Sequence, residues 1–256
     1  MKAKTKTKAL LMSLCAVLLV AASVLGTMAY LTDSKDVKNT FTVGNVTITL
    51  DEAKVDGNGN AINKQGKRVT NLADAERVPG NEYKLLPGHT YTKDPTVTVL
   101  APSVESYVRM KVTFNKASAL IAMCTDPEYA EDGPTGVENA FPLIRMVKFV
   151  EANAAKWDGI IPDNMVDTKD MLADPKYIDA KNDTLTYYFY YKETVEAPTA
   201  DVKLATLFDS IKVPEWATGD QLKALQGFEI NVVAEAIQAD GFENADAAWA
   251  AFAAQK

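Results

Sequence analysis

The chain has 256 residues, 47% of them hydrophobic, which is enough to bury the core of one sizeable domain without disulfides or metals. Its formal net charge of −7 disfavours partners such as nucleic acid or anionic membrane surfaces. The single histidine excludes the paired-histidine zinc site of helical metallopeptidases.

Residues 1–29 have the three parts of a secretory signal peptide. Four lysines precede an apolar run that ends at Ala29, and small residues occupy the positions a signal peptidase recognises, Thr27 at −3 and Ala29 at −1. Cleavage would leave 227 residues beginning at Tyr30, with a formal net charge of −11 because the four lysines are removed. A run of about 20 apolar residues also suffices to span a bilayer, so an uncleaved anchor is the alternative. We expect membrane contact only through this segment.

The first part of the mature chain predicts strands and turns. Residues 30–39 are polar and are expected to be mobile until another strand pairs with them. Alternation of apolar residues with threonines predicts a half-buried strand over residues 41–50. A turn rich in glycine and asparagine follows at residues 56–60. Residues 91–100 and 107–114 alternate again, which predicts two antiparallel strands with a loop between them.

The middle of the chain is less regular. Residues 115–124 are compatible with a short helix capped by Asn115, and residues 125–138 have a loop composition. Residues 143–150 are compatible with either a strand or a helix, because eight residues do not separate the two. Cys124, the one cysteine left after cleavage, follows apolar residues and is expected to be a buried, inert thiol, with an intermolecular disulfide as the alternative.

The last third predicts two more strands and two helices. Residues 185–191 form an aromatic strand, and residues 228–237 alternate as the last strand. Thr218 opens a short helix between them, closed near Gly227, and Asn244 caps a final helix over residues 245–254. The apolar stripe of that final helix, Trp249 and Phe252, is expected to pack on the core, with a binding surface as the alternative.

Together these elements predict a mainly β chain. Seven or more strands separated by turns, with a few inserted helices and a short C-terminal helix, indicate an antiparallel β-sandwich. The composition is uniform after the leader, so residues 30–256 are expected to form a single domain.

Three stretches carry a resemblance to a known family. Residues 26–46, GTMAYLTDSKDVKNTFTVGNV, resemble the leader junction of Gram-positive proteins that are processed by the SipW type of signal peptidase. The family usually has Phe at the position of Leu31. Residues 85–112 and 227–252 are similar to further segments of the same TasA/camelysin family, and the three stretches cover about a third of the chain.

The resemblance implies a jelly-roll fold and a structural role outside the cell. The chain would be secreted or surface-associated in a Gram-positive bacterium, part of a biofilm matrix, with the signal peptidase and other copies of itself as partners. Fibres would grow by donor-strand exchange, in which residues 30–41 leave their own sandwich and complete a neighbour's. The residues that this assigns to the donor segment are Tyr30, Leu31, Asp33, Thr40 and Phe41.

Two other functions stay open at this stage. A monomeric module that binds, for example, glycans would use the tyrosine-rich residues 186–191, although tyrosines in a strand are commonly sandwich packing. A camelysin-like metallopeptidase is suggested only by the family grouping. The sequence offers it no support, because His89 lies in a Pro-Gly turn and is the only imidazole.

The remaining polar groups predict neither a catalytic residue nor a cofactor. Residues 56–60 superficially match the start of a calcium loop, but Ala61 stands where glycine is required and Lys67 where glutamate is required. The acidic groups Asp51–Glu52, Glu131–Asp132 and residues 163–170 are interpreted as solvated faces. We therefore expect no metal site and no enzymatic activity.

Overall fold

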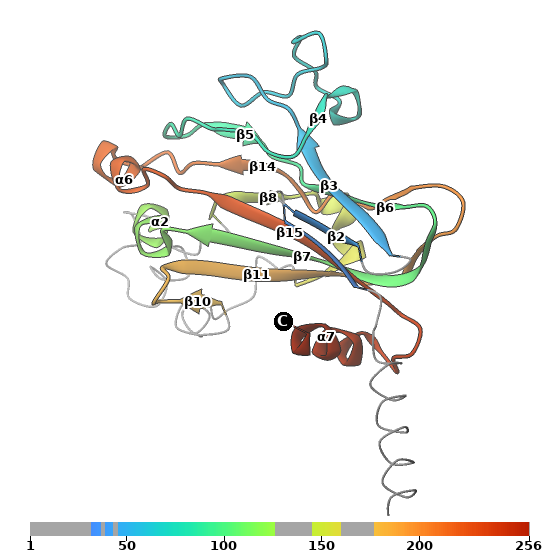
Figure 1. Ribbon diagram of the computed structural model, residues 1–256. Helices are drawn as coiled ribbons and strands as arrows, with labels where there is room; N and C mark the ends of the chain where they lie inside the picture. The colour runs from blue at the N-terminus through green and yellow to red at the C-terminus, as the bar shows by residue number, and fades with distance from the viewer. Residues whose placement is uncertain (1–31, 37–38, 43–45, 126–144, 160–176, 256) are drawn as a thin grey trace, which may run out of the picture.

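The fold of the computed structural model, which describes residues 32–36, 39–42, 46–125, 145–159 and 177–255, is mainly β with a few short helices (Figure 1). The predicted fold class is confirmed, since the paired strands in these residues are antiparallel.

The larger layer is one eight-stranded sheet. Its neighbouring strands are, in order, β10 (Ile178–Asp179), β11 (Thr184–Tyr191), β7 (Ser103–Asn115), β15 (Ile230–Gln238), β1 (Thr32–Asp36) and β2 (Asn39–Thr42). Two short strands extend it, β9 (Trp157–Asp158) on β11 and β12 (Val195–Ala197) on β7. The first described strand, β1, therefore lies beside the last strand, β15.

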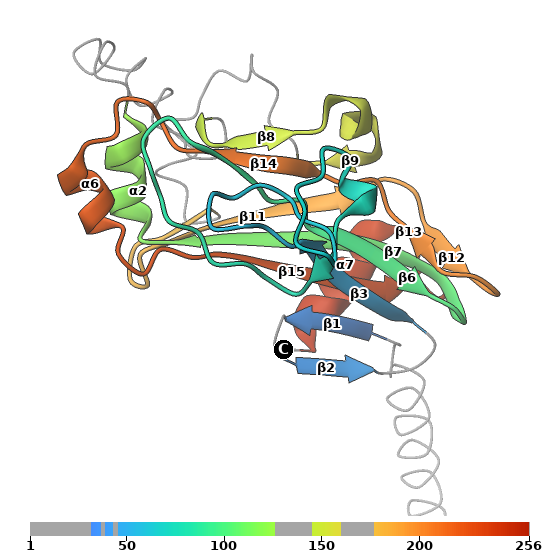
Figure 2. The ribbon, with the colours of Figure 1, turned by 90° about the horizontal axis from the view of Figure 1, so that it is seen from above.

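Two smaller sheets make the second layer, which lies over one face of the large sheet (Figures 1 and 2). One contains β13 (Val202–Lys203), β6 (Thr96–Leu100), β3 (Thr47–Ala53) and β4 (Arg77–Val78). The other contains β5 (Thr90–Thr92), β14 (Phe208–Lys212) and β8 (Val147–Phe149). The helical elements are η1 (Leu72–Asp74), α2 (Ala117–Cys124), η2 (Glu151–Lys156), α6 (Gly219–Ala224) and α7 (Ala245–Ala254).

The main core fills the space between these layers. Ile48 and Val99 from the smaller sheets, and Met110, Phe189 and Ala234 from the large sheet, have no exposed surface and belong to one cluster. Successive side chains of a strand alternate between its faces, so every second residue of the strands in each layer points into this core. Each fully buried valine, leucine, isoleucine or phenylalanine contributes about 1.5–3 kcal/mol.

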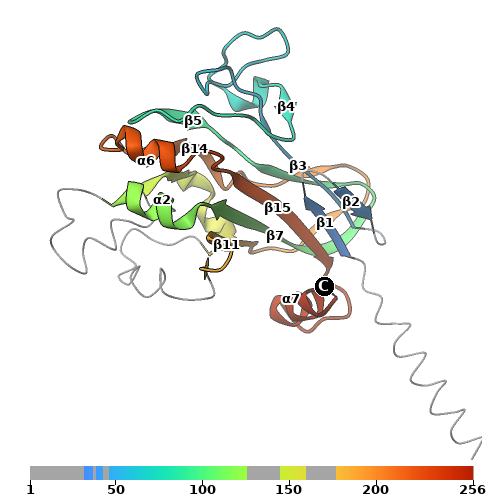
Figure 3. The same cartoon turned by 60° about the vertical axis from the view of Figure 1, so that its left-hand side comes forward.

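Helix α7 covers the opposite face of the large sheet (Figure 3). Trp249 and Phe252 pack there against Ile237, so the predicted packing role of this stripe is confirmed. The predicted cap is also confirmed, because the Asn244 side chain accepts a hydrogen bond from the backbone N–H of Ala247 at 3.0 Å.

Beneath α7 the sheet buries an ion pair. Arg109 Nε and Nη2 each lie 2.7 Å from Glu235 Oε2. The guanidinium also stacks on aromatic rings, with Cζ 4.1 Å from the ring centroid of Trp249 and 4.8 Å from that of Tyr188. Desolvated cation–π contacts of this kind are worth about 2 kcal/mol each.

Two of the predicted strand arrangements are wrong. Residues 41–50 do not form one strand, because β2 ends at Thr42 in the large sheet and β3 begins at Thr47 in the other layer. The strands predicted over residues 91–100 and 107–114 do not pair with each other. β6 pairs with β3 and β13, whereas β7 pairs with β11, β12 and β15. Their apolar faces meet across the core, which places them in opposite layers.

One predicted cap is wrong and another is confirmed. Helix α2 begins after Lys116, which has a left-handed backbone and makes no capping hydrogen bond with its side chain. Asn115 instead bonds to residues just before the last strand, donating to Gly227 O at 3.0 Å and accepting from Glu229 N at 2.7 Å. Thr218 caps α6 as predicted, in a reciprocal box with Gln221.

Candidate functional site

The predicted polymerisation site is only partly described. The cleavage residues Thr27, Ala29 and Tyr30, together with Leu31, lie outside the described residues. Asp33 is in β1, and Thr40 and Phe41 are in β2. Among the helices of the described residues, none has the length and apolar character needed to cross a membrane.

β1 is a strand of the chain's own large sheet. It runs antiparallel to β15, with Thr32 opposite Ile237 and Asp33 opposite Ala236. This pairing involves only residues 234–237 of β15, whereas β7 pairs with β15 from Ile230 to Gln238 on its other side. The segment predicted to be mobile is thus paired within the chain, and β15 keeps its longer partner whether or not β1 is present.

β2 folds back on β1 and ends the sheet. Lys35 lies opposite Thr40 and Ser34 opposite Phe41, and in the described part of the chain no strand follows β2 (Figure 2). An edge strand presents a row of backbone N–H and C=O groups that another chain can pair with. Of the predicted donor residues, Asp33, Thr40 and Phe41 therefore belong to a two-stranded segment at one edge of the large sheet.

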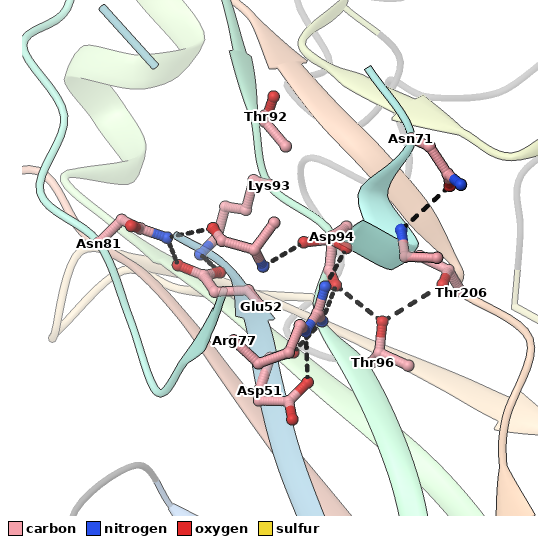
Figure 4. Close-up of polar contacts among 12 residues, drawn as sticks. Asp51, Glu52, Asn71, Arg77, Asn81, Thr92, Lys93, Asp94, Thr96 and Thr206 are labelled. Carbon is pink, nitrogen blue, oxygen red and sulfur yellow. Dashed lines mark hydrogen bonds and ion pairs between the residues drawn. The ribbon is translucent and has the colours of Figure 1, made fainter. Parts of the chain in front are cut away.

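A second candidate site is a buried cluster of charged and polar side chains beside β3 (Figure 4). Lys93 Nζ lies 2.7 Å from Glu52 Oε2, and only 9% and 5% of these two side chains are exposed. The other oxygen of the same carboxylate, Oε1, accepts a hydrogen bond from Asn81 Nδ2 at 2.8 Å. Glu52 therefore brings an amine and a carboxamide together.

Arg77 joins the second half of this cluster. Its guanidinium contacts Asp94 Oδ2 at 2.5 Å and Asp51 Oδ1 at 2.9 Å, and Asp94 also accepts a hydrogen bond from the backbone N–H of Ala53 at 2.6 Å. Burial alone would lower the pKa of Arg77, but the hydrogen bonds and charges of Asp94 and Asp51 raise it. Asp94 thereby joins Arg77 of β4 to Ala53 at the end of β3.

Tyr83 covers the amine of Lys93. The Nζ atom lies 5.8 Å from the centroid of the Tyr83 ring, and the Tyr83 hydroxyl donates to Thr92 O at 2.9 Å. Burial, and then the negative charge of Glu52, raise the pKa of Tyr83 above its usual range. The phenol therefore stays neutral, and its ring shields the Lys93 amine from solvent.

The sequence interpretation missed this cluster. Asp51 and Glu52 were expected to form a solvated face, but Glu52 is only 4% exposed, so that expectation is wrong for Glu52. The signal was present in the alternation, because Glu52 follows Ile48 and Leu50 at a spacing of two and so faces inward. The other two acidic groups, Glu131–Asp132 and residues 163–170, lie outside the described residues.

The remaining polar candidates have local partners. Asp56 accepts hydrogen bonds from Asn60 and Asn58 and pairs with Arg68 at 2.8 Å. Burial alone would raise the pKa of Asp56, but these bonds outweigh it and lower the pKa to about 2. His89 Nε2 lies 2.6 Å from Asn58 O. In the residues that the structure describes, no three His, Cys, Asp or Glu side chains gather closely enough to hold a metal ion.

The thiol and the tyrosine-rich strand also pack internally. Cys124 is buried as predicted, and burial raises the pKa of its thiol to about 12. Tyr187 and Phe189 of β11 face the main core, whereas Tyr188 and Tyr190 lie on the other face, where Arg109 and α7 contact them. This strand therefore favours the packing interpretation over a stacking platform for sugars.

Comparison of the chain with family models, with curated proteins and with solved structures finds no match.

Proposed function

We propose that this chain is a secreted structural protein of the cell surface or biofilm matrix, which assembles into fibres by donor-strand exchange after its signal peptide is removed. One observation supports this most: residues 32–36 of the predicted donor segment form β1, which pairs with residues 234–237 of β15 next to the sheet edge. When β1 and β2 leave, the N–H and C=O groups on that side of β15 are free to accept the same segment from another copy.

The exchange replaces bonds with equivalent bonds. A β1 strand from a neighbour meets the same residues of β15 with the same register, so the hydrogen bonds lost in the donor are regained in the acceptor. The contact joins the N-terminal segment of one copy to a different surface of the next, so it is head-to-tail and generates a filament rather than a closed dimer.

Signal cleavage serves as the switch in this scheme. Before cleavage the donor segment is continuous with an apolar leader, which the membrane holds and which keeps the segment from reaching another subunit. Cleavage at Ala29 frees a new N-terminus at Tyr30, three positions before Asp33 in β1. Mass spectrometry of the secreted protein tests this step, and a leader that is still attached would contradict it.

Fibre growth of purified protein tests the exchange itself. Protein that begins at Tyr30 should form filaments visible by electron microscopy, whereas protein that begins at Thr40 and lacks β1 should not. Unimpaired growth of the shorter protein would refute the proposal. A longer form that light scattering finds persistently monomeric would favour a binding module instead.

Proline substitutions separate backbone pairing from side-chain effects. Successive N–H groups of a central strand point to alternate neighbours, so of Asp33→Pro and Ser34→Pro one removes a donor toward β15 and the other a donor toward β2. The variant that loses a donor toward β15 should slow fibre growth more than the variant that loses a donor toward β2. Lys35→Ala, which keeps every backbone donor, is the matched control and should grow like the parent protein.

A further inference from the structure

The structure points to a covalent bond within the chain, independent of the proposed fibre function. We propose that Lys93 and Asn81 form an intramolecular isopeptide bond, with Glu52 carrying the protons. The two reacting side chains occupy the two oxygens of one carboxylate, at 2.7 Å for Lys93 Nζ and 2.8 Å for Asn81 Nδ2 (Figure 4). Because the fold already holds the two groups close together, the reaction does not have to meet the entropy cost of bringing them together.

The reaction balances without an oxidant or a co-reactant. The Lys93 ammonium gives a proton to Glu52, and the neutral amine attacks Asn81 Cγ to form a tetrahedral intermediate. Glu52 then protonates the departing nitrogen and the C–N bond to Asn81 Nδ2 breaks. Nζ gives its second proton to Glu52, which passes it to the released ammonia. An ammonium side chain and a carboxamide become a secondary amide and one ammonium ion, so charge and atoms are conserved.

The amide of Asn81 is oriented for this attack. The backbone N–H of Val55 donates to Asn81 Oδ1 at 2.9 Å, while Asn81 Nδ2 donates to Ala53 O at 2.9 Å as well as to Glu52. One donor and two acceptors around the amide fix which end of it is oxygen. Val55 N–H thereby faces the atom on which negative charge develops, as in an oxyanion hole.

Burial keeps water away from the reacting groups. Glu52 is 4% exposed and Lys93 is 8% exposed, with the Tyr83 ring over the amine. A desolvated ion pair costs more to keep than one in water, and the exclusion of water strengthens the electrostatic interactions among the reacting groups. The surface pair Lys54–Glu76, at 3.1 Å with 43% and 28% of the side chains exposed, lacks this environment.

The bond would close a ring from residue 81 to residue 93. That ring contains the half-buried Tyr83 and the strand β5, and it is anchored on β3 through Glu52. The segment between β3 and β5 projects from the body of the molecule (Figures 1 and 3). The bond would close the part of this segment that leads into β5, and it would stabilise the fold because cross-linking removes conformations from the unfolded chain.

Intact mass and peptide mapping of the secreted or refolded protein test the proposal. The expected mass is lower than that of the sequence by one ammonia, about 17 Da. Trypsin should fail to cut after Lys93 and should release a branched peptide in which residues 78–84 are joined to residues 85–109. The branch distinguishes this bond from ammonia loss at Asn58–Gly59, which lies in another tryptic peptide.

Variants assign the roles. Asn81→Ala, Lys93→Arg and Glu52→Gln should each keep the full mass and lose the branched peptide, with circular dichroism reporting that the fold is retained. Lys54→Arg is the matched control and should still show the loss of ammonia. A parent protein with the full calculated mass and normal cleavage after Lys93 overturns the proposal, even if every variant fails to fold.

Discussion

The buried pair of Arg109 and Glu235 makes a quantitative prediction about stability. The two side chains are 9% and 1% exposed, and two guanidinium nitrogens lie 2.7 Å from the same carboxylate oxygen. Replacing Glu235 with alanine leaves Arg109 buried under α7 without its counter-charge, a change that typically costs 3–5 kcal/mol. We expect about 3 kcal/mol, since the faces of Trp249 and Tyr188 continue to stabilise the guanidinium.

Urea unfolding of protein that begins at Tyr30, followed by tryptophan fluorescence, measures this change. With an m-value of about 3 kcal/mol/M, expected for a domain of this size, the midpoint of Glu235→Ala should fall by about 1 M. The double variant Arg109→Met/Glu235→Leu should recover to within about 1 kcal/mol of the parent, because it removes both charges and keeps an apolar filling. A Glu235→Ala midpoint within about 0.3 M of the parent would refute the reasoning.

Three further predictions concern single residues. Burial raises the pKa of the Cys124 thiol from the unfolded value of 9.0 to about 12. The buried neutral thiol therefore contributes its full stability below pH 9.0, and the free energy of unfolding falls as the pH rises toward 12. A thiol reagent should label Cys124 only in urea. Asn244→Ala should cost about 1 kcal/mol in urea unfolding, because α7 loses its cap, and no change would argue against that role. Gly159→Ala should cost about 1–3 kcal/mol, because φ is +92° and a Cβ would press on the carbonyl of Tyr188, whereas Gly57→Ala, where nothing lies within 4 Å, should be nearly neutral in the same assay.

Much of the fold was predictable because its signals are local. Alternation over residues 185–191 and 228–237 places strands where β11 and β15 are found. Thr218 and Asn244 cap their helices as predicted, since a capping hydrogen bond joins residues only three positions apart. Asn115 has the same capping potential, but its side chain is committed to partners more than 100 positions away.

Strand pairing and the polar cluster were not predictable, because both depend on contacts between residues that are far apart in the sequence. Alternation states that one face of a strand is buried and leaves open which strand is its neighbour, so β6 and β7 were expected to pair although they lie in opposite layers. Glu52 meets Asn81 and Lys93 across 29 and 41 positions of sequence. An inward-facing carboxylate in an alternating strand indicates that a partner exists, and only the fold identifies it.

The two proposals involve different parts of the molecule. Donor-strand exchange concerns β1 and β2 at one edge of the large sheet, whereas Lys93 and Asn81 lie beside β3 and β4 in the second layer. β15 stays bound to β7 along its full length when β1 leaves, so the core between the layers is retained in donor and acceptor alike. Loss of the isopeptide bond in Lys93→Arg should therefore leave fibre growth intact, and removal of β1 should leave the bond intact. In the proposed fibre the two sites would not interfere, because the covalent bond lies in the second layer and strand exchange takes place at the edge of the large sheet.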